Sequence, residues 1–336
     1  MTEFVEESII VQKHRTARFC AFFHKMLGKS KWGGVTLLVD KTISMKLRHL
    51  LLACLIVAAC GEKPINPDGP TPGPSDPIPV NISLTLETKA LDTSYEAGDQ
   101  IGMYMVYGGS MKSSGNYLDN KKYTLKEGTW KGDDYAYWKD DTTPADFYCY
   151  HPYSAPSDAL AYEFKVKEDQ SDLYAYKASD FLWGKTAGVA PTKNAVAIAT
   201  SHIMSSVTVE LVPGAGFTKE EFAAAKKSVT IGNVKTLSSV NLSTGGVTPK
   251  GDDSSVKAYK DGDIYKAVIV PQSVAADADM LIVTVDGVTY TSREEFTFKP
   301  KTRHQFTVTV DKKAASLDIT VEDWIYDDQN HTSTVN

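Results

Sequence analysis

Residues 281–290 read LIVTVDGVTY. Leu281, Val283 and Val285 recur with the two-residue period of a half-buried β-strand. Asp286-Gly287 follows, a dipeptide that favours the tight turn of a hairpin, and a second strand begins directly after it. This stretch therefore predicts a β-hairpin.

The same alternation recurs along the chain from Val80 onward. Gly, Asp, Lys and Pro turns separate the apolar runs, a pattern typical of an all-β sandwich protein. Sheets of more than about ten strands are uncommon, so we expect two tandem β-sandwich domains, 80–199 and 200–336. Further strands are predicted at Val80–Leu86, Ile101–Tyr107, Asp146–Tyr150, Tyr162–Val166, Val207–Leu211, Phe306–Val310 and Leu317–Val321.

One short helix is predicted, in the second domain. Thr218 and Glu221 have the spacing of a capping box, and Phe217 and Phe222 are placed to pack across it. Good helix formers continue to Lys227.

Residues 45–60 read MKLRHLLLACLIVAAC. A basic start, a short apolar run and small residues before Cys60 are typical of a bacterial lipoprotein signal. A membrane-spanning helix needs about 20 apolar residues, so the anchor would be a lipid on Cys60. We expect residues 45–59 to be the signal peptide and 1–44 to be an upstream extension that is not native. The alternative is that the apolar run is a buried element of a domain.

A proline-rich stretch, 60–79, would follow the lipid. It holds seven of the chain's 15 prolines, which excludes a helix and favours an extended spacer. A disordered linker with no required length is an equal alternative.

Charge and cysteine content narrow the function classes. Residues 1–59 hold nine of the 36 basic and four of the 42 acidic residues, which leaves 27 basic and 38 acidic residues, a net charge of −11. This balance argues against nucleic acid and against electrostatic membrane binding. Cys149 would be the only free thiol of the mature chain, and we interpret it as a small buried residue on a strand.

No pattern of catalytic or metal-binding residues is evident. The histidines after residue 60 lack metal-ligand spacing, no nucleophile elbow occurs, and Gly214-Ala215-Gly216 lacks the rest of a phosphate loop. We therefore expect no enzyme activity, no metal and no cofactor. Tyr148, Tyr150 and Tyr153 could form an aromatic platform for sugars, although core and strand-end packing is the commoner explanation for such tyrosines.

Several segments, in order, resemble motifs of the fimbrillin-like lipoproteins of Bacteroidales. The resemblance covers roughly residues 80–327. It rests on the lipoprotein signal and on Glu96–Tyr104 (EAGDQIGMY), Phe147–Tyr153 (FYCYHPY), Ser201–Val209 (SHIMSSVTV), Tyr265–Gln272 (YKAVIVPQ) and Trp324.

This resemblance implies two transthyretin-like β-sandwich domains and a structural, anchor or accessory role in adhesive cell-surface fimbriae at the outer membrane. Family members that polymerise lose a first strand to a trypsin-like protease, and a strand of another subunit fills the groove. Here Lys89 would be the processing site, where relatives commonly carry Arg. The removed strand would present Val80, Ile82, Leu84 and Leu86.

Two other functions stay open at this point. The first is a lipid-anchored glycan-binding module that uses the Tyr148–Tyr153 aromatics. The second is a hydrolase whose residues have no recognisable pattern.

Overall fold

The hairpin at residues 281–290 forms as predicted. In the computed structural model, which describes residues 76–87, 94–325 and 330–331, β15 (Leu281–Val285) pairs with β16 (Val288–Ser292) in antiparallel register. Asp286 and Gly287 at the turn have φ of 48° and 85°, the left-handed geometry that suits the twist of a hairpin.

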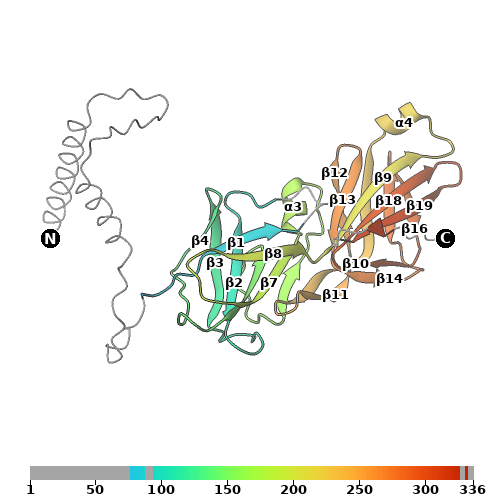
Figure 1. The fold of residues 1–336 in the computed structure, drawn as a ribbon. Coiled ribbons are helices and arrows are strands. Elements are labelled where there is room, and N and C mark those ends of the chain that lie inside the picture. The colour runs from blue at the N-terminus through green and yellow to red at the C-terminus, as the bar shows by residue number, and fades with distance from the viewer. Residues whose placement is uncertain (1–75, 88–93, 326–329, 332–336) are drawn as a thin grey trace, which may run out of the picture. The chain divides into compact units, whose positions relative to one another are not determined.

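The first half of the chain forms a seven-stranded sheet with strand order β1-β8-β7-β5-β2-β3-β4 (Figure 1). All neighbours are antiparallel except the pair β1–β8, which is parallel. The strands are β1 (Ile82–Leu86), β2 (Gln100–Val106), β3 (Leu118–Lys126), β4 (Thr129–Gly132), β5 (Ala145–His151), β7 (Leu182–Val189) and β8 (Val196–His202).

The rest of the described chain forms a five-stranded sheet, a six-stranded sheet and a two-stranded ribbon. The five-stranded sheet has the order β11-β10-β15-β16 with β6 also on β10, and the six-stranded sheet has the order β12-β13-β9-β18-β19-β20. The strands are β6 (Tyr162–Lys165), β9 (Ser205–Pro213), β10 (Lys227–Asn241), β11 (Gly246–Lys257), β12 (Tyr259–Asp261), β13 (Ile264–Ile269), β18 (Thr302–Asp311), β19 (Ser316–Ile325) and β20 (Asn330–His331), with β14 (Gln272–Val274) pairing β17 (Phe296–Phe298).

Two short helices are described, where the sequence predicts one. The predicted helix is α4 (Lys219–Ala224), with its capping box complete and the rings of Phe217 and Phe222 5.1 Å apart. The other is α3 (Leu173–Ala178), whose N-cap Asp172 accepts a hydrogen bond from the Ala175 amide. Neither helix among the described residues is long and apolar enough to cross a membrane.

The central strands of the seven-stranded sheet are buried on both faces. On β5, Phe147 and Cys149 belong to one apolar cluster, which lies within the first half of the chain. Tyr148 and Tyr150 point the other way, into a second cluster that continues into the later sheets. Cys149 is therefore the small buried strand residue that the sequence indicates, and burial raises the pKa of its thiol.

The second cluster also shows how the two halves of the chain connect. The strand β6 precedes the predicted boundary near residue 199, yet it pairs with β10. The indole of Trp183 donates to the carbonyl of Leu242 at 2.7 Å. All described residues fall in one compact unit, Pro72–Asn336, so the division into domains 80–199 and 200–336 stays a prediction.

Candidate functional site

The first strand, β1, is an edge strand of the seven-stranded sheet. It pairs in parallel register with β8, from Ile82 opposite Val196 to Leu86 opposite Thr200. Among the described residues, β8 is the only strand to which residues 82–86 are hydrogen-bonded. An edge strand held along one side is the part of a sheet that can leave with the fewest broken contacts.

The apolar side chains of this strand face the core, as the alternation predicts. Val80 and Ile82 are buried, Leu84 and Leu86 are half-buried, and the residues between them are exposed. Full burial of one Val or Ile side chain is worth about 1.5–3 kcal/mol. The strand therefore contributes part of the core of the sheet that it borders.

The N-terminal end of β1 is held on its second side as well. The amide of Val80 donates to the carbonyl of Ala136 at 2.8 Å, and the amide of Trp138 donates to the carbonyl of Ile78 at 2.9 Å. Tyr123 also donates its hydroxyl to the carbonyl of Val80. The segment that follows β4 thus meets the segment that precedes β1, and the two edges of the sheet join at this point.

The C-terminal end of β1 is fastened to Thr200. The amide of Glu87 donates to the Thr200 carbonyl at 2.8 Å, and the Thr200 hydroxyl donates to the carbonyl of Thr85 at 3.2 Å. Tyr95, on the far side of residues 88–93, places its hydroxyl 2.8 Å from Thr200 Oγ1. Burial raises the pKa of Tyr95, and the hydrogen bond with Thr200 offsets only part of that effect.

A cavity of about 80 Å³ adjoins this end of the strand, with Leu86 and several charged residues in its wall. His151 Nε2 lies 3.9 Å from Asp99 Oδ1 there, and Asp180, also in the wall, lies 2.6 Å from the buried His202. Burial lowers the pKa of His151 although Asp99 and Asp180 act in the opposite direction. Within the described residues, no group of three His, Cys, Asp or Glu side chains is placed to hold a metal ion.

Two of the predicted site residues, Cys60 and Lys89, lie outside the described residues. The lipidation site and the processing site therefore stay predictions.

The proposed sugar platform of Tyr148, Tyr150 and Tyr153 is not supported by the structure. Tyr148 and Tyr150 are 3% and 2% exposed. The ring of Tyr150 stacks on Phe181, with centroids 5.8 Å apart and planes 9° apart, and its hydroxyl donates to the carbonyl of Ser154. Tyr153 is half-buried. The faces that would bind sugar are already used in packing, because β5 is a central strand with both faces covered.

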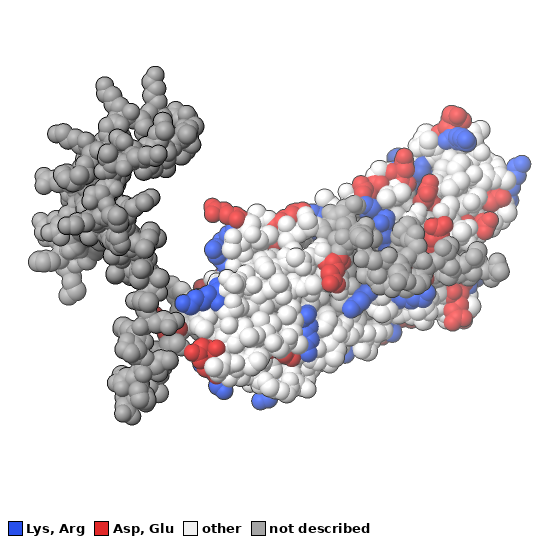
Figure 2. Space-filling view, in the orientation of Figure 1, with Lys and Arg blue, Asp and Glu red and all other residues white. Residues whose placement is uncertain are grey.

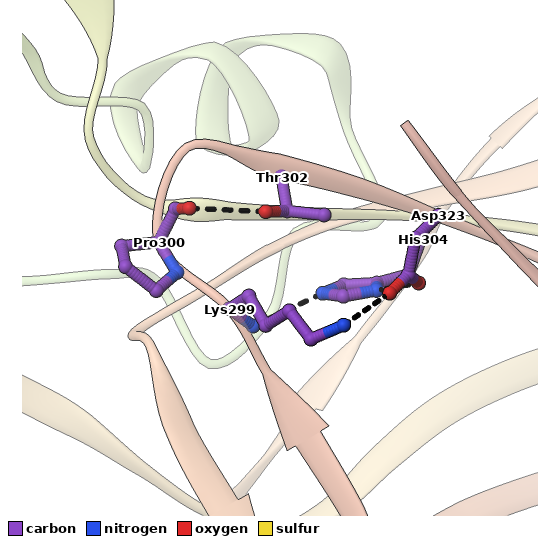
Figure 3. A network of polar contacts seen from close by, with 5 residues as sticks. All are labelled: Lys299, Pro300, Thr302, His304 and Asp323. Carbon is purple, nitrogen blue, oxygen red and sulfur yellow. Dashed lines mark hydrogen bonds and ion pairs between the residues drawn. The ribbon is translucent and has the colours of Figure 1, made fainter. Parts of the chain in front are cut away.

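A buried histidine and carboxylate join two strands of the six-stranded sheet (Figure 3). His304 Nδ1 lies 2.5 Å from Asp323 Oδ1, and Lys299 Nζ donates to Asp323 Oδ2 at 2.7 Å. His304 Nε2 accepts the backbone N–H of Lys299 at 3.1 Å, so the ring is neutral with its proton on Nδ1.

The geometry of His304, Asp323 and Lys299 fits a role in holding the two strands together. Burial lowers the pKa of His304, and hydrogen bonds from Lys299 and His304 keep the pKa of Asp323 low despite its burial. His304 is fully buried, and its acceptor nitrogen is taken by a backbone amide, so the ring has no position from which to remove a substrate proton.

Charged side chains of both signs are interspersed over the visible face in Figure 2. Ion pairs at the surface of the seven-stranded sheet include Lys122 with Asp133 at 2.6 Å and Lys185 with Asp146 at 3.4 Å. Exposed pairs of this kind contribute at most about 1 kcal/mol each.

Together these observations define a β-sandwich protein whose first strand closes the edge of a sheet. A family model described as Fimbrillin-like matches residues 88–324, and the chain belongs to this family.

Relatives and solved structures agree with this assignment. The chain is 26% identical over 295 residues to a Bacteroides uniformis protein named "Putative fimbrium subunit Fim1C", covering 82% of this chain and 93% of the relative. Its fold is similar to that of a "putative cell adhesion protein" from Bacteroides uniformis, with a TM-score of 0.60 and 24% identity over 74% of this chain and 99% of the other. A second such protein, from Bacteroides ovatus, gives a TM-score of 0.55 and 17% identity over 74% and 98% of the two chains.

Proposed function

We propose that the chain is a subunit of a cell-surface fimbrium that is exported as a lipoprotein and joins other subunits by strand addition. The observation that carries this proposal is the placement of β1. It is a parallel edge strand that buries apolar side chains at alternate positions and is followed, two residues after Glu87, by Lys89.

The physical basis is that a strand of another subunit could make the same backbone bonds and fill the same apolar pockets as β1. Loss of β1 would leave the backbone of β8 unpaired next to Val196 and Ile198, which are now buried. An unpaired strand edge beside apolar pockets is a template for a strand of another chain. The entering strand would need apolar residues at every second position, as β1 has.

The lipid anchor and the outer-membrane location rest on the sequence around Cys60. A family relation to a fimbrium subunit supports a place at the cell surface, and the proline-rich stretch would hold the folded part away from the membrane. The family consists of fimbrial structural proteins, which favours a structural role over an enzymatic one.

Strand addition can be tested with a cleavable chain. A site for a sequence-specific protease is placed at residues 88–93, the chain is cut, and a labelled peptide with the sequence of residues 76–87 is added. We expect the peptide to replace the resident strand. Peptides with Ile82→Asp and Leu84→Asp should not bind, whereas a peptide with Ser83→Asp, on the exposed side, should. The proposal is wrong if the cut protein stays folded and takes up the unchanged and the substituted peptides equally, or takes up none of them.

The anchor is tested separately in the bacterium that makes the protein. Mass spectrometry of the native N-terminus is expected to find a lipid-modified Cys60, and Cys60→Ala should release the protein from membranes. Cys54→Ala is the matched control, because Cys54 lies inside the predicted signal peptide and would be removed with it. A mature chain that begins upstream of Cys60 contradicts the assignment.

A further inference from the structure

The segment that joins the two edges of the seven-stranded sheet also presents aromatic rings to solvent. Along residues 135–139 (YAYWK), Ala136 and Trp138 are buried, whereas Tyr135, Tyr137 and Lys139 are exposed. The side chains of this segment thus alternate between solvent and core, as in a β-strand, although residues 135–139 are not part of any strand of the sheet. Sequence reading missed it, and the alternation of two tyrosines with Ala and Trp is the signal that could have found it.

Two pairs of tyrosine rings lie on or beside this segment, and Tyr107 is half-buried while the other three rings are exposed. Tyr135 and Tyr137 stack with centroids 6.2 Å apart and planes 16° apart. The ammonium of Lys139 lies 5.8 Å from the centre of the Tyr107 ring, and Tyr107 meets Tyr117 edge to face at 4.8 Å. We call these five residues the tyrosine stripe.

The backbone that carries Tyr135 and Tyr137 is held from beneath. Trp138 packs its ring on Phe147 in the core, at 5.3 Å between centroids. The backbone bonds of Ala136 and Trp138 to residues 78–80 fix the segment on one side, and the amide of Lys139 donates to the Tyr107 hydroxyl at 2.8 Å. A backbone that is ordered before binding loses little conformational entropy when a ligand arrives.

Three of the rings are open to solvent. Tyr135 is 88% exposed, Tyr117 42% and Tyr137 38%. Solvent-exposed aromatic rings gathered in one place mark a binding surface more often than isolated apolar residues do.

We propose that the tyrosine stripe binds a polysaccharide through the flat C–H faces of its pyranose rings. Every aromatic ring of the stripe is a tyrosine with a polar hydroxyl, and Lys139 within the stripe and its neighbours Asp133 and Asp134 are charged and exposed. The centre of a protein–protein interface is depleted of charged residues. A sugar, by contrast, needs an apolar ring face bordered by hydrogen-bonding groups, which is what this surface offers.

The proposal goes beyond fimbrial assembly and does not depend on the lipid anchor. It applies to the chain with β1 in place, because residues 78–80 hold the segment that carries Tyr135 and Tyr137. It also differs from the platform predicted at Tyr148–Tyr153, because none of those rings belongs to the stripe.

Affinity electrophoresis of the full chain through gels containing starch, β-glucan, xyloglucan, mannan or mucin glycans tests it. We expect at least one polymer to retard the protein, and Tyr135→Ala and Tyr137→Ala to weaken that retardation by about tenfold. Tyr135→Phe should keep most of it, since the ring face remains. Tyr174→Ala is the matched control, because Tyr174 is 80% exposed on α3, outside the stripe.

Circular dichroism of each variant establishes that it is folded. No retardation by any of the polymers would overturn the proposal, as would an equal loss in Tyr174→Ala. If the chain instead forms oligomers without polysaccharide and Tyr135→Ala abolishes them, the stripe binds a second copy and the sugar assignment is wrong.

Discussion

The ring of Tyr150 occupies the space that a side chain at Gly102 would need. A Cβ atom on Gly102 would lie 2.2 Å from Cε1 of Tyr150 and 2.3 Å from Oδ1 of Asn120. Gly102 and Tyr150 are paired across β2 and β5, and Tyr150 Oη lies 2.7 Å from Asn120 Oδ1. The segments Glu96–Tyr104 and Phe147–Tyr153, which sequence reading treats as separate motifs, are thus in direct contact.

Substituting Gly102→Ala should therefore destabilise the protein by steric overlap. We expect a cost of about 1–3 kcal/mol in the free energy of unfolding, the usual range for overpacking a buried site. Urea denaturation followed by circular dichroism measures it. Gly246→Ala is the control, because the nearest atom to a Cβ there is a flexible threonine hydroxyl at 3.2 Å. Equal stability of the two variants would show that the Tyr150 ring moves aside.

Gly287→Ala should destabilise the protein for a different reason. A Cβ on Gly287 meets nothing within 4 Å, but the residue has φ of 85° in the hairpin turn. The expected cost is about 1 kcal/mol, from the left-handed backbone alone. The same urea titration checks it. A loss of stability well above that of Gly102→Ala would contradict this, because the left-handed backbone alone could not account for it.

The buried face of β1 can be tested without any assumption about processing. Ile82 is 3% exposed, so Ile82→Ala should cost about 2–5 kcal/mol in the free energy of unfolding. Ser83→Ala, on the exposed side of the same strand, should change it by no more than about 0.5 kcal/mol. A thermal melt of both variants gives the comparison. Similar melting temperatures would indicate that β1 is not packed as described.

His304 should make the stability of the protein depend on pH. Its folded-state pKa lies below the ordinary value of 6.5 because the ring is buried, so protonation favours the unfolded chain. The groups that face it are Asp323, Lys299 and the rings of Phe296 and Phe298. The contribution of His304 is therefore complete above pH 6.5 and decreases as the pH falls below that value.

His304→Gln isolates this effect, because an amide can donate to Asp323 and accept from the Lys299 amide without titrating. Between pH 7 and pH 5, we expect the unfolding free energy of the wild type to fall more steeply than that of the variant, by at most about 1.4 kcal/mol per pH unit. Asp323, with its lowered pKa, acts only at lower pH. Parallel curves for the two proteins would show that His304 has the same pKa in the folded and the unfolded chain, which contradicts the prediction.

Much of the fold follows from local pattern. The strand pattern predicts β1, β2, β5 and β9 close to their observed bounds and about half of β18 and β19, and Asp286-Gly287 fixes the hairpin between β15 and β16. The capping box at Thr218 predicts α4. These features depend on residues within about ten positions of one another, and sequence contains that information directly.

Other elements depend on partners distant in sequence. β11 contains Pro249, Gly251, Asp252 and Asp253, a composition that predicts a loop, yet it pairs with β10 through two register shifts. Pairing with a long neighbour outweighs local propensity there. The helix α3 is too short to show a helical period in the sequence. Its N3 residue is Ala175, not Glu or Gln, so the sequence has no capping box that would predict it.

The amino-acid sequence by itself determined that this chain is built of strands, that its first strand has one apolar side, and that it resembles the fimbrillin-like family. Only the tertiary structure decided which tyrosines are buried. Tyr148 and Tyr150 are in the core because β5 is central and covered on both faces, whereas Tyr135 and Tyr137 are exposed because their segment closes the edge of a sheet. Alternation tells which residues share a face, but strand order decides whether that face meets protein or water.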